Sequence, residues 1–256
     1  MRGLFGKAAA VAAAFVLACA PAVSNSAQAS VQPDVVGGTP TDETYPFMTS
    51  LADGDGHFCG ASLIRSNWLV TAAHCVDGVS ADTLTARIGS ADRTEGGEVG
   101  QPAEIVVHPS YTAPGSPNDL ALVRLAEPVT AAPIDIAESA EPGTATRLLG
   151  WGRTCAQDGC GESPVMLQQL DTRVVQDDRC AAGFTARSEV CTGNPDGGGA
   201  CYGDSGGPQI VRDGDRWRLI GMSSRAGNDD AVCGTAPSIY TSAPAHRTWI
   251  DETIAA

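Results

Sequence analysis

Short apolar or alternating runs recur along the chain, and glycine, proline, aspartate and asparagine separate them. Regularly spaced short runs with turn residues between them are typical of the strands of an all-β sandwich or barrel. One run, at 120–125, is almost continuously apolar, which indicates a strand buried within the wall of such a fold. The other clear runs are at 46–51, 68–72, 84–88, 104–107, 146–151, 170–175, 208–211, 217–222 and 239–240. Periodicity alone does not distinguish a barrel from a sandwich.

One segment has a helical pattern. Residues 244–254 begin with Pro244 and place Trp249 and Ile250 on one side, which predicts a C-terminal helix. No internal repeat or long low-complexity tract is visible, and the length of 256 residues suits one large domain or two small ones. We therefore expect an all-β fold that ends in one helix.

Residues 1–29 are expected to be a secretory signal peptide. Arg2 and Lys7 supply its positive end, residues 8–20 form an apolar stretch too short to span a bilayer, and residues 27–29 read Ala-Gln-Ala, a cleavage signal. The exported chain would begin at Ser30 and be extracellular, without a membrane partner. A lipoprotein with an acylated Cys19 is the alternative, and Leu17 fits that signal poorly.

The net charge of −14 argues against a nucleic-acid partner, because polyanions bind to basic surfaces.

The cysteine count indicates an oxidising compartment. Of nine cysteines, Cys19 lies in the expected signal peptide, and the remaining eight are enough for four disulfide bonds. Eight cysteines allow roughly a hundred connectivities, and the sequence does not choose among them. No Cys-x-x-Cys pair is present, which argues against a zinc site.

Three separated segments carry groups that suit nucleophilic catalysis. Residues 201–208 read Cys-Tyr-Gly-Asp-Ser-Gly-Gly-Pro, residues 71–75 read Thr-Ala-Ala-His-Cys, and residues 118–122 read Asn-Asp-Leu-Ala-Leu. A serine hydroxyl becomes a good nucleophile when a base takes its proton and amide donors hold the oxyanion. The glycines around Ser205 let the backbone adopt unusual dihedral angles, so that amide N–H groups near Ser205 can point to one place. His74, Asp119 and Ser205 follow one another in an order used by one class of serine protease.

The chain resembles the chymotrypsin-like (trypsin-family) serine endopeptidases, most of all their secreted bacterial members. The resemblance rests on these three segments, on Val-Val-Gly-Gly at 35–38 and on Trp-Ile at 249–250. The resemblance extends from Val35 to Ile250. It implies two six-stranded antiparallel β-barrels, at about 35–135 and 140–243, a C-terminal helix at 244–254, and an active site between the barrels. It also implies a monomer whose partners are protein or peptide substrates, an activating protease and protein inhibitors.

The resemblance assigns a role to each group of the site. Ser205 is the nucleophile, His74 is its general base and then the general acid for the leaving amine, and Asp119 orients the His74 ring. The amides of Gly203 and Ser205 form the oxyanion hole. Ser224 supports Asp119. The remaining histidines have no partner motif and are expected to be surface or packing residues: His57, His108 and His246.

The family pairs the aspartate before the nucleophile, here Asp204, with the amino group of a processed N-terminus. In this chain that amine would belong to Val35, released by cleavage after Asp34. Residues 30–34 are therefore expected to be a propeptide, and the chain a zymogen. A buried carboxylate without a partner is costly, so the site should assemble fully only when the ammonium is available. Because Asp34 is not basic, we expect a separate processing protease rather than self-activation.

The resemblance also assigns the substrate pocket. Gly199 stands at its base, where an aspartate would select lysine or arginine, and Ala226 and Ser238 stand where open pockets have glycine. A neutral, narrowed pocket favours small or medium apolar side chains, as in elastases, and a preference for aromatic side chains is the alternative. Arg225 replaces a family tryptophan, so it either attracts acidic substrate residues or points into solvent. Ser224 lines the substrate channel.

Disulfide pairs also follow from the resemblance. It implies Cys59–Cys75, Cys180–Cys191 and Cys201–Cys233, and it leaves Cys155 with Cys160. We expect no cofactor and no metal, because the family's calcium loop would fall at 92–98, where the chain is short and glycine-rich. The alternative function is a catalytically weak homologue that acts as a binding protein through the same fold.

Overall fold

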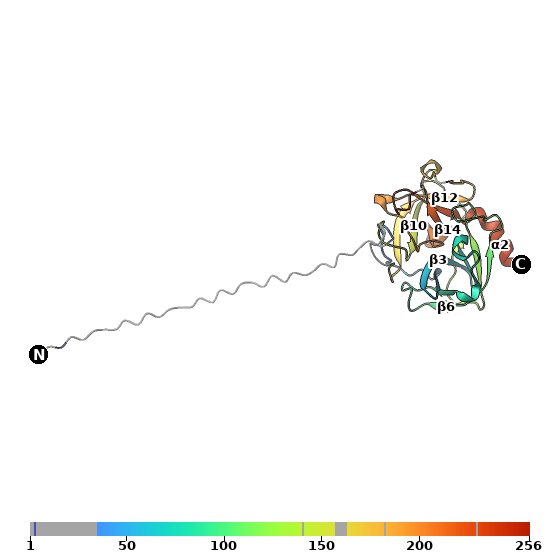
Figure 1. Ribbon diagram of the computed structural model, residues 1–256, viewed down its shortest axis with the longest axis horizontal. Helices are drawn as coiled ribbons and strands as arrows, with labels where there is room; N and C mark the ends of the chain where they lie inside the picture. The colour runs from blue at the N-terminus through green and yellow to red at the C-terminus, as the bar shows by residue number, and fades with distance from the viewer. Residues whose placement is uncertain (1–2, 4–34, 140, 157–162, 182, 229) are drawn as a thin grey trace. The chain divides into compact units, whose positions relative to one another are not determined.

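The structure is a computed structural model that describes residue 3 and residues 35–256, apart from 140, 157–162, 182 and 229. The expected propeptide and nearly all of the expected signal peptide lie outside the described residues. From residue 35 onward, the chain forms two mainly antiparallel sheets and a C-terminal helix (Figure 1). Among the described residues, no helix is both long enough and apolar enough to cross a membrane.

The first sheet has seven strands in the order β6-β5-β2-β3-β4-β8-β7. All of its neighbours are antiparallel. The strands are β2 (Met48–Asp53), β3 (Gly56–Arg65), β4 (Trp68–Thr71), β5 (Thr85–Ile88), β6 (Glu98–Gly100), β7 (Pro102–Val107) and β8 (Ala121–Leu125).

The second sheet has eight strands in the order β1-β11-β10-β13-β14-β15-β12, with β9 paired in parallel to β14. The strands are β1 (Thr39–Pro40), β9 (Asp135–Ile136), β10 (Ala145–Gly150), β11 (Gln168–Arg173), β12 (Glu189–Thr192), β13 (Pro208–Asp213), β14 (Arg216–Ala226) and β15 (Ser238–Ser242). An isolated bridge between Val174 and Thr192 joins the ends of β11 and β12, so this sheet curls back on itself.

The helices are short. The catalytic candidate His74 lies in α1 (Ala73–Val76), and the chain ends in α2 (Arg247–Ala255), directly after the 3₁₀ turn η4 (Pro244–His246). The other 3₁₀ turns are η1 (Ala81–Thr83), η2 (Asp177–Arg179) and η3 (Pro195–Gly197). Ile250 is the buried residue of α2, which explains why the apolar side of this segment signalled a helix.

The all-β class, the curled antiparallel sheets and the C-terminal helix are confirmed. The expected six strands per barrel differ from the seven and eight found, because very short strands extend each sheet. β1 and β9 have two residues each, and β6 has three. β1 also pairs with β11, so residues 39–40 belong to the second sheet although they precede the first one in the sequence.

The interior of the first sheet explains its sequence pattern. Residues 120–123 and Leu125 are at most 1% exposed, which confirms the buried strand expected at 120–125. β3 is the main strand without a clear apolar run, because Cys59 and Gly60 interrupt it. A Cβ atom on Gly60 would lie 2.7 Å from the Cα of Gly207, so glycine is required where β3 meets the segment that carries Ser205.

Candidate active site

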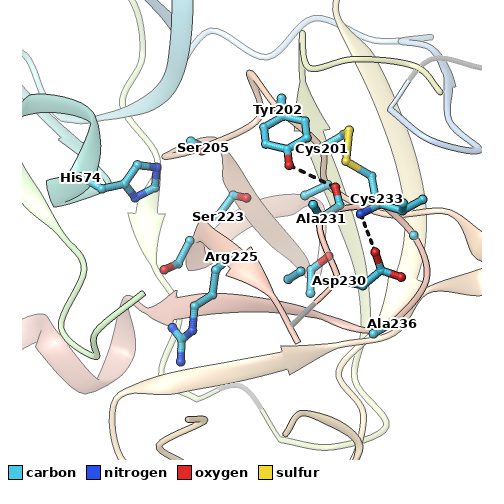
Figure 2. Close-up of a pocket in the computed structure, with 16 residues that line it drawn as sticks. His74, Cys201, Tyr202, Ser205, Ser223, Arg225, Asp230, Ala231, Cys233 and Ala236 are labelled. Atoms are coloured by element: carbon cyan, nitrogen blue, oxygen red, sulfur yellow. Dashed lines mark hydrogen bonds between the residues drawn. A yellow bond between two sulfur atoms is a disulfide. The ribbon is translucent and has the colours of Figure 1, made fainter. Parts of the chain in front are cut away.

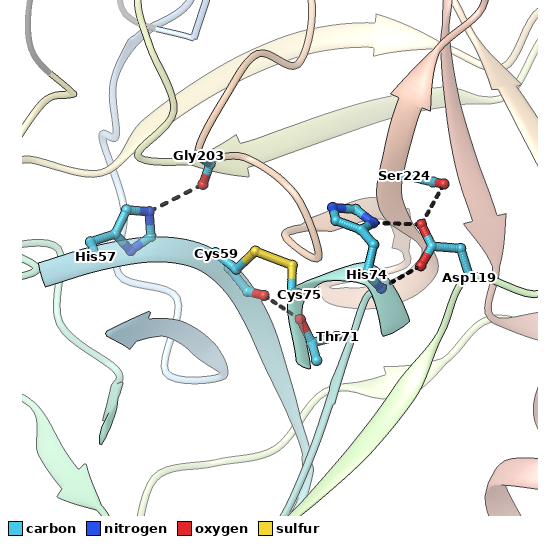
Figure 3. The surroundings of a disulfide bond; sticks show 9 residues. His57, Cys59, Thr71, His74, Cys75, Asp119, Gly203 and Ser224 are labelled. Atoms are coloured by element: carbon cyan, nitrogen blue, oxygen red, sulfur yellow. Dashed lines mark hydrogen bonds and ion pairs between the residues drawn. A yellow bond between two sulfur atoms is a disulfide. The ribbon is translucent and has the colours of Figure 1, made fainter. Parts of the chain in front are cut away.

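The backbone around His74 is held from two sides. The buried strand β4 leads directly into α1, and Cys75 in α1 forms a disulfide bond with Cys59 in β3 (Figure 3). The hydroxyl of Thr71 at the end of β4 donates to the carbonyl of Gly60, at 2.7 Å. These contacts fix the backbone from which the His74 side chain projects, and that side chain remains 20% exposed.

Asp119 holds His74 through both of its carboxylate oxygens. Oδ2 accepts a hydrogen bond from Nδ1 of the ring at 2.7 Å, and Oδ1 accepts one from the His74 backbone N–H at 2.9 Å (Figure 3). The Asp119 side chain is fully buried, and the hydroxyl of Ser224 also donates to Oδ2, at 2.7 Å. Because a carboxylate accepts the Nδ1 proton, the Nε2 atom of His74 is the one available to take up another.

The pKa of Asp119 lies below its ordinary value. Burial by itself raises this pKa, but the hydrogen bonds from His74 and Ser224 outweigh that effect. The lowered pKa favours the ionised form of Asp119. It can orient the ring and stabilise an imidazolium.

Asp119 sits at a sharp turn in front of β8. Asn118 has a φ of 61°, in the left-handed region that asparagine tolerates better than most residues. The ring of His246 contacts the Asn118 side chain at 3.0 Å and the carbonyl of Ser242 at 2.7 Å. His246 is buried, so it is a packing residue that ties the segment before α2 to the turn carrying Asp119.

Ser205 is positioned by backbone contacts. Its carbonyl accepts a hydrogen bond from the N–H of Gly60 at 2.7 Å, and the next residue, Gly206, donates to the carbonyl of Ser223 at 2.8 Å. Gly206 has a φ of 74°, and a Cβ atom there would lie 2.1 Å from Oγ1 of Thr71. The second sheet thus delivers Ser205 to the part of the first sheet that carries His74. Both residues line one pocket of about 430 Å³ (Figure 2).

Gly203 has a φ of 98°, and its carbonyl lies 3.1 Å from Nε2 of His57 in β3. A carbonyl only accepts hydrogen bonds, so Nε2 carries the proton and Nδ1 accepts from the hydroxyl of Ser50 at 2.8 Å. Burial lowers the pKa of His57 to about 4, which keeps this ring neutral near pH 7. His57 is thus attached to the expected oxyanion hole, a role that its place in the sequence did not signal.

Asp204 is buried beside Ser205. Its Oδ1 accepts from the N–H of Gly152 at 2.8 Å and its Oδ2 from the N–H of Cys201 at 2.9 Å. A Cβ atom on Gly150 or Gly152 would come within 2.3 Å of this carboxylate, so both positions require glycine. Burial raises the pKa of Asp204 to about 7, against the lowering effect of its two backbone hydrogen bonds.

Val35, the expected new N-terminus, is 1% exposed and has a φ of 49°. The next residue, Val36, forms an isolated bridge with Gly199, whose N–H donates to the Val36 carbonyl at 2.9 Å. Val36 therefore docks on the segment that leads to Ser205.

The pocket contains most of the residues expected to bind substrate. Gly199 lies next to it, and a Cβ atom there would meet Oγ of Ser238 at 3.3 Å. Asp230 also lines the pocket and was not anticipated; its carboxylate accepts from the N–H of Val232 at 2.9 Å. The lining residues are His74, 200–202, Ser205, 223–226, 230–234, Ala236 and Ser238.

Arg225 forms an ion pair with Glu189 of β12, with nitrogen–oxygen distances of 2.5 and 3.2 Å. The Arg225 side chain is only 13% exposed, so the alternative that it points into solvent is wrong. Nothing in the sequence pattern connected these two residues, which are 36 positions apart.

The structure contains three of the four expected disulfide bonds: Cys59–Cys75, Cys180–Cys191 and Cys201–Cys233. The fourth expected pair includes Cys160, which lies outside the described residues. In the described part of the chain, one group of three potential metal ligands lies close together: Cys59, His74 and Cys75. Its two sulfur atoms are bonded to each other and are not thiolates, so this group does not suit a metal ion.

Comparisons with known proteins agree with this architecture. A sequence model of the trypsin family matches residues 35–250. A trypsin of Saccharopolyspora erythraea is 35% identical over 201 residues, which cover 74% of this chain and 86% of that protein. A trypsin of Sarcophaga bullata is 32% identical and covers 86% of this chain and 88% of its own length. Cationic trypsin-3 of Rattus norvegicus is 36% identical, over 87% of this chain and 90% of its own length.

Proposed function

Because the chain belongs to the trypsin family and is a serine endopeptidase, we propose that His74, Asp119 and Ser205 are its catalytic residues. The observation that carries this proposal is the pair of hydrogen bonds that buried Asp119 accepts from His74, which lines the same pocket as Ser205. That arrangement leaves Nε2 of His74 free to act on a hydroxyl in the same pocket.

In the proposed reaction, Ser205 Oγ attacks the carbonyl carbon of the scissile peptide bond while Nε2 of His74 takes the hydroxyl proton. The imidazolium then gives this proton to the leaving amine, and an ester between Ser205 and the acyl half of the substrate remains. Water, deprotonated by His74, hydrolyses the ester and restores the serine. Asp119 stays ionised throughout and holds the ring in place.

We assign the oxyanion hole to the backbone N–H groups of Gly203 and Ser205. The tetrahedral intermediates carry a negative oxygen, and removal of one such donor typically costs about 3 kcal/mol of transition-state stabilisation. The bond from His57 to the Gly203 carbonyl supports this assignment, because it fixes the Gly203–Asp204 peptide plane, which lies between the planes that carry the two donor N–H groups.

For the residue before the scissile bond, we propose a small or medium apolar side chain. Gly199 brings no charge to the base of the pocket, and Ser238 and Ala226 add atoms to its walls. Aromatic side chains are the competing preference. Asp230 brings a carboxylate to the lining, hydrogen-bonded to its own loop.

We also propose that residues 1–29 direct export and that cleavage after Asp34 activates the chain. Two observations support activation by this cleavage: Val35 is buried, and burial raises the pKa of the Asp204 carboxyl. A new ammonium at Val35 would compensate the negative charge of ionised Asp204. The three disulfide bonds support an oxidising, extracellular location.

Labelling with a fluorophosphonate tests the catalytic assignment. Protein shown by mass spectrometry to begin at Val35 should be labelled at Ser205 and should cleave a peptide library, with cleavage after alanine, valine or leucine. Ser205→Ala should abolish both. Ser163→Ala is the matched control, because Ser163 also lies near Gly203 but has no proposed role, and it should keep both activities. An unlabelled, inactive wild-type protein would favour the binding homologue, and cleavage after arginine or lysine would refute the pocket assignment alone.

A further inference from the structure

A buried ion pair forms part of the wall beside the catalytic candidates. Strands β12 and β14 both pair with β15, with Glu189 opposite Thr241 and Arg225 opposite Ile239. Across β15, the guanidinium of Arg225 donates to both carboxylate oxygens of Glu189, at 2.5 and 3.2 Å. A forked guanidinium that meets both oxygens of a carboxylate has the strongest geometry available to such a pair.

The pair is also attached to the loop before β12. The backbone N–H of Thr185 donates to Oε2 of Glu189 at 2.6 Å, and Arg225 donates to the carbonyl of Gly183 at 3.3 Å. The Glu189 side chain is fully buried and that of Arg225 is 13% exposed. A carboxylate at this depth is tolerated because charged and amide donors surround it.

Arg225 belongs to the same wall as the catalytic candidates. It lines the pocket that contains His74 and Ser205 (Figure 2), and it directly follows Ser224, whose hydroxyl is bonded to Asp119. A register shift in the β14–β15 ladder falls between Ser223 and Arg225, and this shift lets Ser224 turn toward Asp119. A substrate bound against this wall therefore passes close to the Arg225 side chain.

A lone guanidinium at that place would attract substrate carboxylates, but the pair with Glu189 cancels its charge. We propose that Glu189 is a specificity-determining residue, which neutralises Arg225 and prevents the groove from selecting acidic side chains. The proposal rests on the endopeptidase function proposed above. It assigns to this protein no preference for acidic residues near the scissile bond, in contrast to a protein with an unpaired arginine at the same site.

The test compares peptides with glutamate or glutamine at each position on both sides of the scissile bond. For wild type, we expect the kcat/KM ratio of glutamate to glutamine peptides to stay below about threefold at every position. Glu189→Gln keeps the shape of the side chain but removes its charge, and it should raise this ratio by about tenfold at one position or more, which corresponds to about 1.4 kcal/mol. The double variant Glu189→Met with Arg225→Met has no charge there and should return to the wild-type ratio.

Asp213→Asn is the control variant, because Asp213 also forms an ion pair with an arginine, Arg218, but does not line the pocket. It should leave the ratio unchanged. An active, folded Glu189→Gln variant with an unchanged ratio would overturn the proposal, and so would a wild type that already prefers glutamate tenfold. If Glu189→Gln does not fold, the double variant decides: a tenfold loss of glutamate preference relative to wild type would mean that Arg225 was attracting acids. A wild type that cleaves no peptide and takes up no fluorophosphonate refutes the proposed function instead.

Discussion

The buried carboxyl of Asp204 should make the stability of the unprocessed chain depend on pH. Its pKa is raised from 3.8 to about 7 by burial, although the N–H groups of Cys201 and Gly152 donate to it. Between about pH 4 and pH 7 the folded chain therefore retains a proton that the unfolded chain has lost. The contribution of this group to the free energy of unfolding is fully present below about pH 4. It is lost as the pH rises through 7, and the loss amounts to about 4 kcal/mol.

Cleavage after Asp34 should remove most of this dependence. The new ammonium of Val35 is a partner for ionised Asp204, so the processed chain retains free energy of unfolding that the unprocessed chain loses. Near pH 7.5 we expect the processed chain to be more stable by up to about 4 kcal/mol, with the smallest difference near pH 4.

Urea unfolding between about pH 4.5 and pH 7.5 measures this, on both forms and with Ser205→Ala present so that neither form digests itself. Asp204→Asn is the control. Its amide NH₂ meets one of the two backbone N–H donors, which costs about 1 kcal/mol at every pH, but it does not titrate. If the free energy of unfolding of the unprocessed chain falls equally with rising pH with and without Asp204→Asn, Asp204 is not the source of the pH dependence, and the reasoning is refuted. Identical pH curves for the two forms would refute the pairing with Val35.

Three further substitutions test other parts of the site. Asp119→Asn removes the charged acceptor of the His74 Nδ1 proton, and steady-state kinetics should show kcat reduced about 10³- to 10⁴-fold with KM nearly unchanged; a loss under tenfold would contradict its role. His57→Phe keeps a ring but removes the N–H that holds the Gly203 carbonyl, and we expect kcat to fall about five- to tenfold, the effect of one neutral hydrogen bond, with the pH profile of kcat unchanged. Gly206→Ala places a Cβ atom 2.1 Å from Thr71 Oγ1, and it should lower the free energy of unfolding in urea by about 3 kcal/mol. A decrease below about 1 kcal/mol would contradict the close approach.

The strands that the sequence predicted well are those that are buried along nearly their whole length and have clear turns around them. The runs at 68–72 and 120–125 correspond to β4 and β8, whose side chains are almost all buried. β3 gave a weaker signal, because Gly60 is required by a contact with the second sheet and not by the strand itself. Local pattern reflects burial within one element, so a residue chosen for a distant contact disturbs that pattern.

The same distinction applies to the site. His74, Asp119 and Ser205 stand in short motifs, which made them recognisable although 45 or more positions separate each from the next. His57, Glu189 and Asp230 carry no motif. His57 on β3 bonds to the carbonyl of Gly203, and Glu189 pairs with Arg225 across β15. These partners become apparent only when the strands are paired.

The attachment of Ser205 to the first sheet has an evolutionary consequence. The bond that joins the two sheets at this point runs from the N–H of Gly60 to the carbonyl of Ser205, and main-chain atoms are retained when side chains are replaced. The pocket walls at 225–226 and at Ser238, by contrast, consist of side chains on β14 and β15. Mutations in those walls can therefore accumulate without disturbing the main-chain bond that attaches Ser205 to the first sheet. Proteins built on this scaffold can change the side chains of the pocket walls one substitution at a time, while the main-chain contact that holds Ser205 is kept.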